Sequence, residues 1–460
     1  MKISNIFRNI TVEPVLFLYM FCTFMSFPLL QQLAYRKICQ EKLNETSCEN
    51  LTKTQRDGVQ EDTSNWMVYQ SVALGVPSIA ASLVYGSWSD SVGRKFIMIL
   101  PPIGNALMNI NYLLNVHFFQ VNVNYLLIGI VISGFFGGYA TVLSSVFSYI
   151  ADVSDKSSRT LRISILESMV FLGASGGEMV AGVLLDSSGF MAAFGLALAI
   201  NVCIILYVSL WLRESYFPTD QVHANPLIKL HSHIKNVLTV LFKARDEDQR
   251  LYLLVVLFGA LPIVLINFGG FNDTSLLYII NQPLSFSSSY IGYFLSEVYF
   301  IRGLGVVVGM PILTKYFKVS DYLIAVFGMM ITLVVFIFYG FATRKWMMFL
   351  GAAFAFGDGW PVPCMRAMMS KSVQTDEQGT MFAAVASLEV LSTLLASLIF
   401  NSIYSKTVSW LPGFTFFLLS GILLIPIGII LTLYFKKRKG YQYKVMEDPE
   451  DSIHNLPVNT

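Results

Sequence analysis

The chain has 460 residues, of which 55% are hydrophobic and only 13% are charged, and its mean hydropathy is +0.60. Soluble domains carry roughly 25% charged residues, so a soluble protein of this composition could not cover its own surface. The formal net charge of +2 is too small to indicate nucleic-acid binding.

Twelve apolar stretches are long enough to cross a bilayer as helices, which takes about 20 mostly apolar residues each. Six lie in residues 1–212, near 13–35, 66–86, 96–117, 123–147, 163–185 and 190–212. A polar, basic segment, 213–250, separates them from six more in residues 251–435, near 251–271, 290–313, 321–342, 346–368, 380–402 and 413–435. A polar tail, 436–460, follows. The first stretch has the position of a secretory signal, but no small-residue cleavage site follows its long apolar core, so we interpret it as a spanning helix.

The distribution of Lys and Arg in the short loops predicts the orientation, because cytosolic loops carry an excess of both. One side collects the central segment 213–250, the run 436–439, and Arg94, Lys95, Lys156, Arg159, Arg162, Lys315, Lys318 and Lys371. Both termini are therefore expected in the cytosol. Twelve spans divided by a central cytosolic segment predict an all-α membrane protein of two six-helix halves, a design found in transporters.

The polar loop 36–65 carries features of the exoplasmic side. It contains two glycosylation sequons, at Asn44 and Asn50, and two cysteines, Cys39 and Cys48. Glycosylation and disulfide formation both occur on the oxidising side of a membrane, so we expect glycosylation here and a Cys39–Cys48 disulfide.

The loop after the second span, Gly86–Lys95, reads GSWSDSVGRK. It resembles the signature loop of the major facilitator superfamily, with Gly86, Asp90, Gly93, Arg94 and Lys95 at the recurring positions. The glycines permit a tight turn, and Arg94 can pair with an acidic group on an adjacent span. Such contacts can latch one conformation and break in the other. An ordinary positively charged cytosolic loop is the alternative interpretation.

Ionisable side chains within the predicted spans are the candidates for function, since each costs about 2.5–3.5 kcal/mol on insertion scales. They are Glu167, Glu178, Glu297, Arg302, Asp358, Arg366 and Glu389. Burial favours the neutral form of a carboxyl group, which suits proton uptake, and we take Glu167 and Glu389 as proton-coupling candidates. Arg366 is the candidate counter-charge for an anionic substrate or for a carboxylate, and Glu297 and Arg302 are further candidates for a substrate or counter-charge role. The alternative is a static structural pair that holds helices together, formed by Glu297 with Arg302 or Arg366. Glu178, toward the exoplasmic end of its span, is expected to be exposed to water.

Other function classes find no support in the sequence. No nucleophile motif with its base is present, so we predict no enzyme, and no metal ligands or cofactor-binding motif is recognised. A channel would require a pore-lining charge ring or filter, and none is visible.

Several segments together resemble solute carrier family 46, from Val12 to about Phe435. They are the Gly86–Arg94 loop, Ala151–Ser154, Met365–Ala367, Asp376–Gly379 and Trp410–Phe416. Val12–Pro14, the Ser-Leu-Glu389 stretch and Thr407–Trp410 are most similar to the lysosomal member of this family, which also includes a proton-coupled folate transporter.

The resemblance implies a proton-coupled symporter with the major facilitator fold. For the lysosomal member it implies export of steroid conjugates, bile acids and similar bulky amphipathic anions into the cytosol. It also implies that Glu167 is the span-five glutamate of proton coupling and Arg366 the span-ten arginine. The alternatives are a plasma-membrane folate carrier and a transport-inactive receptor or scaffold on the same fold.

Two departures disfavour folate as the substrate. The folate transporter has a histidine in span seven, where this chain reads Ile266–Gly269, and a cysteine after that span, where this chain reads Pro283–Phe286. In the tail, Tyr443 and Met446 fit a tyrosine-based endolysosomal sorting pattern, which predicts binding of sorting adaptors and a lysosomal membrane location.

Overall fold

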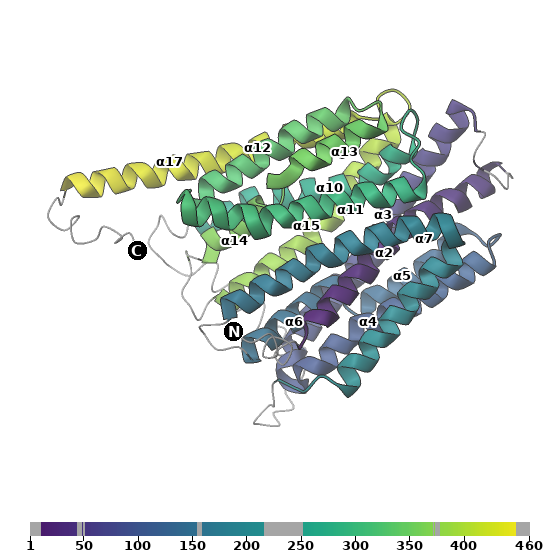
Figure 1. Ribbon diagram of the computed structural model, residues 1–460, viewed down its shortest axis with the longest axis horizontal. Coiled ribbons are helices and arrows are strands. Elements are labelled where there is room, and N and C mark those ends of the chain that lie inside the picture. The colour runs from purple at the N-terminus through teal and green to yellow at the C-terminus, as the bar shows by residue number, and fades with distance from the viewer. Residues whose placement is uncertain are drawn as a thin grey trace.

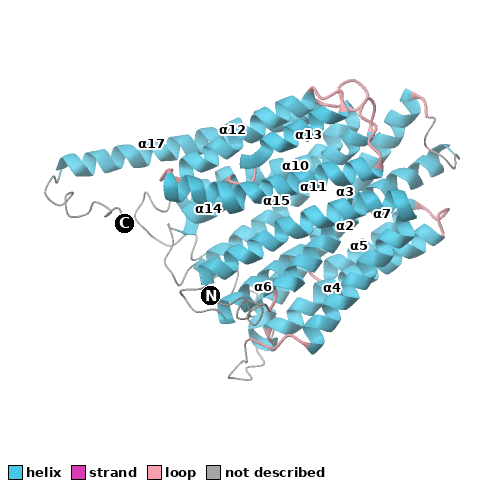
Figure 2. Cartoon of the chain, viewed as in Figure 1, coloured by secondary structure: helices cyan, strands magenta, loops and turns pink. Residues whose placement is uncertain are grey.

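The computed structural model of the chain describes residues 11–43, 48, 51–153, 159–215, 252–370, 372 and 378–447. Within those ranges the regular elements are helices and no strand occurs (Figure 2). Figure 1 shows the helices running side by side in two groups. Those of residues 13–210, purple to teal, lie on one side of the bundle, and those of residues 252–447, green to yellow, lie on the other.

The N-terminal half is built from α2 (Glu13–Leu43), α3 (Lys53–Val92), α4 (Arg94–His117), η1 (Val123–Tyr125), α5 (Leu126–Phe135), α6 (Gly138–Val153) and α7 (Arg159–Leu210). The fifth and sixth predicted spans are both parts of α7. They are separated by a kink at Gly189, whose φ of 76° is accessible to glycine at little cost.

The C-terminal half contains η2 (Val255–Ala260), α10 (Leu261–Ile280), α11 (Ser288–Leu304), η3 (Gly305–Gly309), η4 (Ile312–Tyr316), α12 (Asp321–Gly340), α13 (Lys345–Phe354), η5 (Ala355–Gly357), α14 (Pro361–Ser370), α15 (Gln378–Thr407), α16 (Phe414–Ile422) and α17 (Leu424–Glu447). The predicted span near 346–368 is interrupted around Asp358, between η5 and α14. Pro361 and two flanking glycines favour a break there.

The helices are consistent with twelve spans, which remain a prediction. Nine stretches of the described chain are long and apolar enough to cross a membrane, and one of them, Ser168–Leu210, has 43 residues, about twice the length of a single span. Large apolar side chains on the outside of the bundle, among them Phe327, Val334 and Phe354, are more than half exposed. That surface is suited to contact with lipid tails.

The segment predicted as a polar loop at 36–65 is mostly helical, which corrects the sequence-based boundaries. α2 continues to Leu43, and α3 begins at Lys53. Thr52 caps α3 in a capping box: the Gln55 N–H donates to Thr52 Oγ1 (3.4 Å), and the Thr52 N–H donates to Gln55 Oε1 (3.0 Å).

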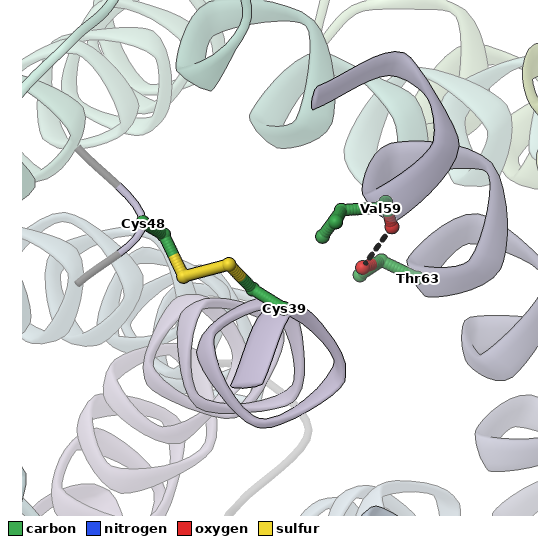
Figure 3. The surroundings of a disulfide bond; sticks show 4 residues. All are labelled: Cys39, Cys48, Val59 and Thr63. Atoms are coloured by element: carbon green, nitrogen blue, oxygen red, sulfur yellow. Dashed lines mark hydrogen bonds between the residues drawn. A yellow bond between two sulfur atoms is a disulfide. The ribbon is translucent and has the colours of Figure 1, made fainter. Parts of the chain in front are cut away.

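A disulfide joins Cys39 on α2 to Cys48, close to the first turns of α3 around Val59 and Thr63 (Figure 3). We call this end of the bundle the disulfide end and the opposite one, where Gly93 separates α3 from α4, the signature-loop end. The sequon residues Asn44 and Asn50 lie outside the described residues.

The tail also differs from the predicted boundary, because α17 continues to Glu447 rather than ending near residue 435. Backbone hydrogen bonding continues the helix through the polar residues that follow the apolar run. The stretch with Tyr443 and Met446 is therefore helical, and the side chains there are outside the described part of the chain.

Candidate functional site

A buried ion pair lies in the middle of the C-terminal half. Arg302 on α11 donates from Nε to Asp358 Oδ2 (3.0 Å), and Thr332 on α12 donates from Oγ1 to Asp358 Oδ1 (2.9 Å). The Arg302 side chain is 4% exposed and that of Asp358 is 14% exposed. The Arg302 guanidinium also lies over the Phe268 ring, 4.4 Å from its centroid. Pairing and cation–π contact compensate the loss of water around the buried charge.

The backbone around Asp358 permits this pairing. A Cβ on Gly359 would lie 2.7 Å from Arg302 Cγ, so only glycine allows α11 to approach this closely. The Trp360 indole N–H donates to the Gly305 carbonyl (2.9 Å) and so ties the turn to η3. The Gly-Asp-Gly-Trp sequence thus fixes the carboxylate beside the arginine.

A small cavity adjoins this pair. Arg302 lines it, and the Nη1 of its guanidinium has no hydrogen-bond partner among the described residues. The other lining residues are mostly apolar or aromatic and include Val264, Asn267, Phe268, Phe271, Met329, Thr332, Phe336, Asp358, Pro361, Val362 and Leu423. An incompletely paired guanidinium beside aromatic rings is suited to a ligand with an anionic group and an apolar body.

A second arginine–carboxylate pair joins Arg366 on α14 to Glu389 on α15. Their side chains are 32% and 18% exposed, so this pair is wetter than the Arg302–Asp358 pair. Of the two predicted counter-charges of Arg366, a substrate anion or a carboxylate, the structure shows the second, the Glu389 carboxylate. The proton-coupling candidate Glu389 is therefore ion-paired in this conformation.

The suggested static pairs of Glu297 with Arg302 or Arg366 are wrong. Each arginine pairs with a different carboxylate, and the half-buried Glu297 makes no ion pair in the described chain. Positions 297 and 302 are five residues apart on α11, which points their side chains to different faces of the helix. Glu167 lies on α7, but its side chain is outside the described residues.

The signature loop is held by two acidic residues of its own half. Arg94 Nε donates to Asp152 Oδ2 on α6 (3.2 Å), and the Arg94 backbone N–H donates to Glu214 Oε1 (2.8 Å). Lys95 Nζ donates to the Ser209 carbonyl (2.8 Å). Gly86 and Asp90 lie on the part of α3 whose side chains are not described. The pairing of Arg94 with an acidic group on an adjacent span agrees with the sequence-based expectation.

Polar side chains that were not among the sequence-predicted site residues join the two halves at the disulfide end. Ser64 on α3 donates to the Asn401 carbonyl on α15 (2.7 Å), and the Tyr404 hydroxyl donates to Gln60 Oε1 (2.9 Å). Asn401 Nδ2 also donates to the buried Asp273 carboxylate (3.1 Å). Asp273 was not among the predicted intramembrane charges because its span was predicted to end at residue 271, whereas α10 continues to Ile280. The apolar run after Asp273 was the available signal.

The crossing of α7 and α11 also joins the halves. Ser175 Oγ and Ser296 Oγ are hydrogen-bonded (3.0 Å), and the Ser289 backbone N–H donates to Asp186 Oδ2 (2.7 Å). Glu178 lies between these contacts and is only 2% exposed. The expectation that Glu178 is exposed to water is therefore wrong, because α11 covers it.

Comparisons with known proteins agree with this architecture. The model of the Major Facilitator Superfamily matches residues 13–397. The lysosomal proton-coupled steroid conjugate and bile acid symporter SLC46A3 of Gallus gallus is 31% identical over 462 residues, covering 97% of this chain and 98% of the relative. The proton-coupled folate transporter of Rattus norvegicus is 29% identical over 455 residues, covering 98% of this chain and 95% of the relative.

Solved structures share the fold at low sequence identity. The human organic anion transporter MFSD10 (TETRAN) superimposes with a TM-score of 0.65 at 17% identity, covering 91% of this chain and 98% of that chain. A POT peptide transporter in complex with sulfate gives a TM-score of 0.63 at 13% identity, covering 93% and 95%.

Proposed function

Since the chain belongs to solute carrier family 46 of the major facilitator superfamily and is a proton-coupled, multi-pass membrane transporter, we propose that it exports bulky amphipathic organic anions from lysosomes to the cytosol. The proposed substrates are steroid conjugates, bile acids and small peptide or drug catabolites. The names of its relatives support the substrate class, and the chain itself supplies a site of matching chemistry.

The observation that carries this proposal is the cavity at Arg302. One nitrogen of a guanidinium that is 4% exposed has no partner in the described chain, and Phe268, Phe271 and Phe336 line the same cavity. A sulfate or carboxylate group would accept from Arg302, and a fused-ring body would pack on the aromatic side chains. A larger binding space than this cavity is required, and a rearrangement of helices within the C-terminal half would have to supply it, because the cavity's lining residues all belong to that half.

Proton coupling is assigned to Glu167 and to the pair of Glu389 with Arg366. An intramembrane carboxylate that pairs with arginine becomes neutral when it binds a proton, and the arginine is then free to bind another anion. Proton binding to the carboxylate would break its ion pair with the arginine, and would thereby link proton binding to the affinity for an anionic substrate. The partial exposure of this pair allows water to reach it.

The orientation follows from the charge distribution of the loops. We place the disulfide end in the lysosomal lumen, with the Cys39–Cys48 disulfide and the sequons at Asn44 and Asn50, because that compartment is on the oxidising, glycosylated side. The central segment 213–250 and the tail would then face the cytosol. Recognition of Tyr443 and Met446 by sorting adaptors would direct the protein to lysosomes.

Uptake by cells tests this function. With the tail pattern disabled by Tyr443→Ala so that the protein reaches the cell surface, uptake of a radiolabelled steroid sulfate and of a radiolabelled folate is measured at pH 5.5 and pH 7.4. We expect uptake of the steroid sulfate to be greater at pH 5.5 and uptake of folate to stay at the level of untransfected cells.

The opposite pattern separates the alternatives. Uptake of folate in preference to the steroid sulfate would identify a folate carrier. The presence of the protein at the cell surface without Tyr443→Ala would then be examined. Absence of uptake of either compound at both pH values, with the protein present at the surface, would favour a receptor or scaffold.

A further inference from the structure

Glu178 lies within the contact between the two halves. It is on α7, one turn from the hydrogen bond between Ser175 and Ser296 (3.0 Å) and one turn from Gly182, where the backbones of α7 and α11 meet. A Cβ on Gly292 of α11 would lie 2.7 Å from the Glu178 carbonyl oxygen. The Glu178 side chain is thus enclosed where the halves are closed against each other at the disulfide end.

The surroundings of Glu178 offer little compensation for a negative charge. Among the described residues its Oε2 has no hydrogen-bond partner, and no Lys, Arg or His lies within ion-pair distance of the carboxyl group. The ionisable group that faces it from α11 is Tyr299, whose hydroxyl already donates to Asn272 Oδ1 (3.1 Å). From α2, Phe21 and Met25 pack against the neighbouring Gly177, and neither ionises.

An unpaired carboxylate is stable in water but not in such an enclosure, because burial removes its hydration without replacing it. When the halves separate at the disulfide end, as alternating access requires, water reaches Glu178 and the carboxyl group ionises normally. To close again, the transporter must either bury an unpaired charge or bind a proton at Glu178 from the solution on that side.

We propose that Glu178 is a proton-binding site distinct from Glu167, loaded from the disulfide end, and that its proton is required for the halves to close there. This proposal rests on the proposed function, because it gives the acidic lysosomal lumen a direct effect on the transport cycle. It lies eleven residues beyond Glu167 on α7, about 16 Å along the helix axis. Tyr299 lies between it and the anion site, with its ring 5.6 Å from the Arg302 guanidinium.

The direction of the pH effect follows from linkage. The closed state holds one more proton than the open state. The population of the closed state is therefore favoured at low pH and decreases as the pH rises. Once the pH is high enough for the open state to have lost this proton, the ratio of closed to open molecules should fall by up to about tenfold per pH unit.

The experiment measures the opening directly, without substrate. Spin labels are attached at Ser187→Cys on α7 and Tyr290→Cys on α11, both exposed near the disulfide end, in full-length protein carrying Cys203→Ser to remove the exposed free thiol. Distance distributions are recorded in lipid nanodiscs from pH 5 to pH 8. They are compared for the wild-type background, Glu178→Gln and the matched control Glu61→Gln, an exposed carboxyl on α3.

We expect the short, closed distance to give way to a longer one as pH rises in the wild-type background and in Glu61→Gln, and to persist at all pH values in Glu178→Gln. Glu178→Met, which is apolar and of similar length, should behave like Glu178→Gln and replaces it if the amide variant does not fold. A pH-dependent distance in the folded Glu178 variants would overturn the proposal. Loss of the pH dependence in the single variant Asp273→Asn, with Glu178 intact, would also overturn it, because that result would assign the effect to Asp273. Because no substrate is present, failure to transport steroid conjugates leaves this result unaffected.

Discussion

Gly182 and Gly292 bring the two halves of the molecule into backbone contact. A Cβ on Gly182 would lie 2.3 Å from the Ser288 carbonyl oxygen and 2.8 Å from the Gly292 Cα. No side chain fits between α7 and α11 at this point. Closure at the disulfide end therefore depends on the absence of side-chain atoms at two positions that lie far apart in the sequence.

Gly182→Ala is expected to prevent full closure at the disulfide end and to lower substrate uptake by at least tenfold, since the added methyl group overlaps the backbone of α11. The matched control is Gly195→Ala, also on α7, where an added Cβ meets nothing within 4 Å. That control should keep normal uptake and gain about 0.5–1 kcal/mol of stability from the higher helix propensity of alanine. Equal uptake by the two variants, at equal surface expression, would contradict the steric argument.

Removing one partner of the Arg302–Asp358 pair should destabilise the protein. Arg302→Met leaves the Asp358 carboxylate buried without its cation, at an expected cost of about 3–5 kcal/mol, which a thermal melt in detergent would register. The double variant Arg302→Met, Asp358→Leu removes both charges and should recover most of that stability. We expect it to remain inactive in uptake of a steroid sulfate, because the anion-binding guanidinium is gone. Restored uptake in the double variant would show that the pair is only structural.

Glu167→Gln tests the assignment of proton coupling to span five. An amide cannot gain or lose the proton, so we expect accumulation driven by an inward-directed proton gradient to be abolished while exchange of labelled for unlabelled substrate continues. Both are measured in proteoliposomes, with Glu61→Gln as the control for the same chemical change at an exposed site. Undiminished gradient-driven accumulation in Glu167→Gln would remove Glu167 from the mechanism.

Gly93→Ala should weaken the signature loop. Gly93 has a φ of +101°, which is unfavourable for alanine, and a Cβ there would lie 2.5 Å from Glu214 Oε2. We expect a loss of about 1–3 kcal/mol in thermal stability from strain and from displacement of the Glu214 carboxylate. Gly421→Ala on α16, where a Cβ would meet nothing within 4 Å, serves as the control and should keep or slightly raise the melting temperature, because alanine has the higher helix propensity. A Gly93→Ala protein as stable as this control would contradict the prediction.

The sequence predicted the spanning helices because apolar runs report the surfaces that contact lipid and core. It missed the extension of α3 back to Lys53, since the first turns of that helix are polar and stand at the disulfide end beyond the apolar run. The signal was present in the spacing of Thr52 and Gln55, which form a capping box. Hydropathy alone does not detect a helix that continues beyond the bilayer.

The candidate site could be predicted by residue type but not by pairing. All the charged residues of the two arginine pairs were recognised as costly within spans. The partner of Arg302 is 56 residues away, and this choice depends on how α11 packs against the turn before α14. The five-residue spacing of Glu297 and Arg302, by contrast, argued against their pairing from helix geometry alone. Burial of Glu178 required the same tertiary knowledge, because α11 rather than its own helix encloses it.

The contacts that join the halves at the disulfide end are mainly hydroxyl and amide groups, as in the Ser64–Asn401 and Gln60–Tyr404 pairs. Water molecules can replace each partner of a neutral hydrogen bond with little change in enthalpy, and each such bond contributes only about 0.5–1.5 kcal/mol net. Ion pairs between the halves would weaken as the salt concentration rises. The neutral hydrogen bonds seen here should instead let the halves open and close with similar ease at low and at high salt. These hydrogen bonds together hold the halves closed at the disulfide end, and water can replace them one after another as that end opens.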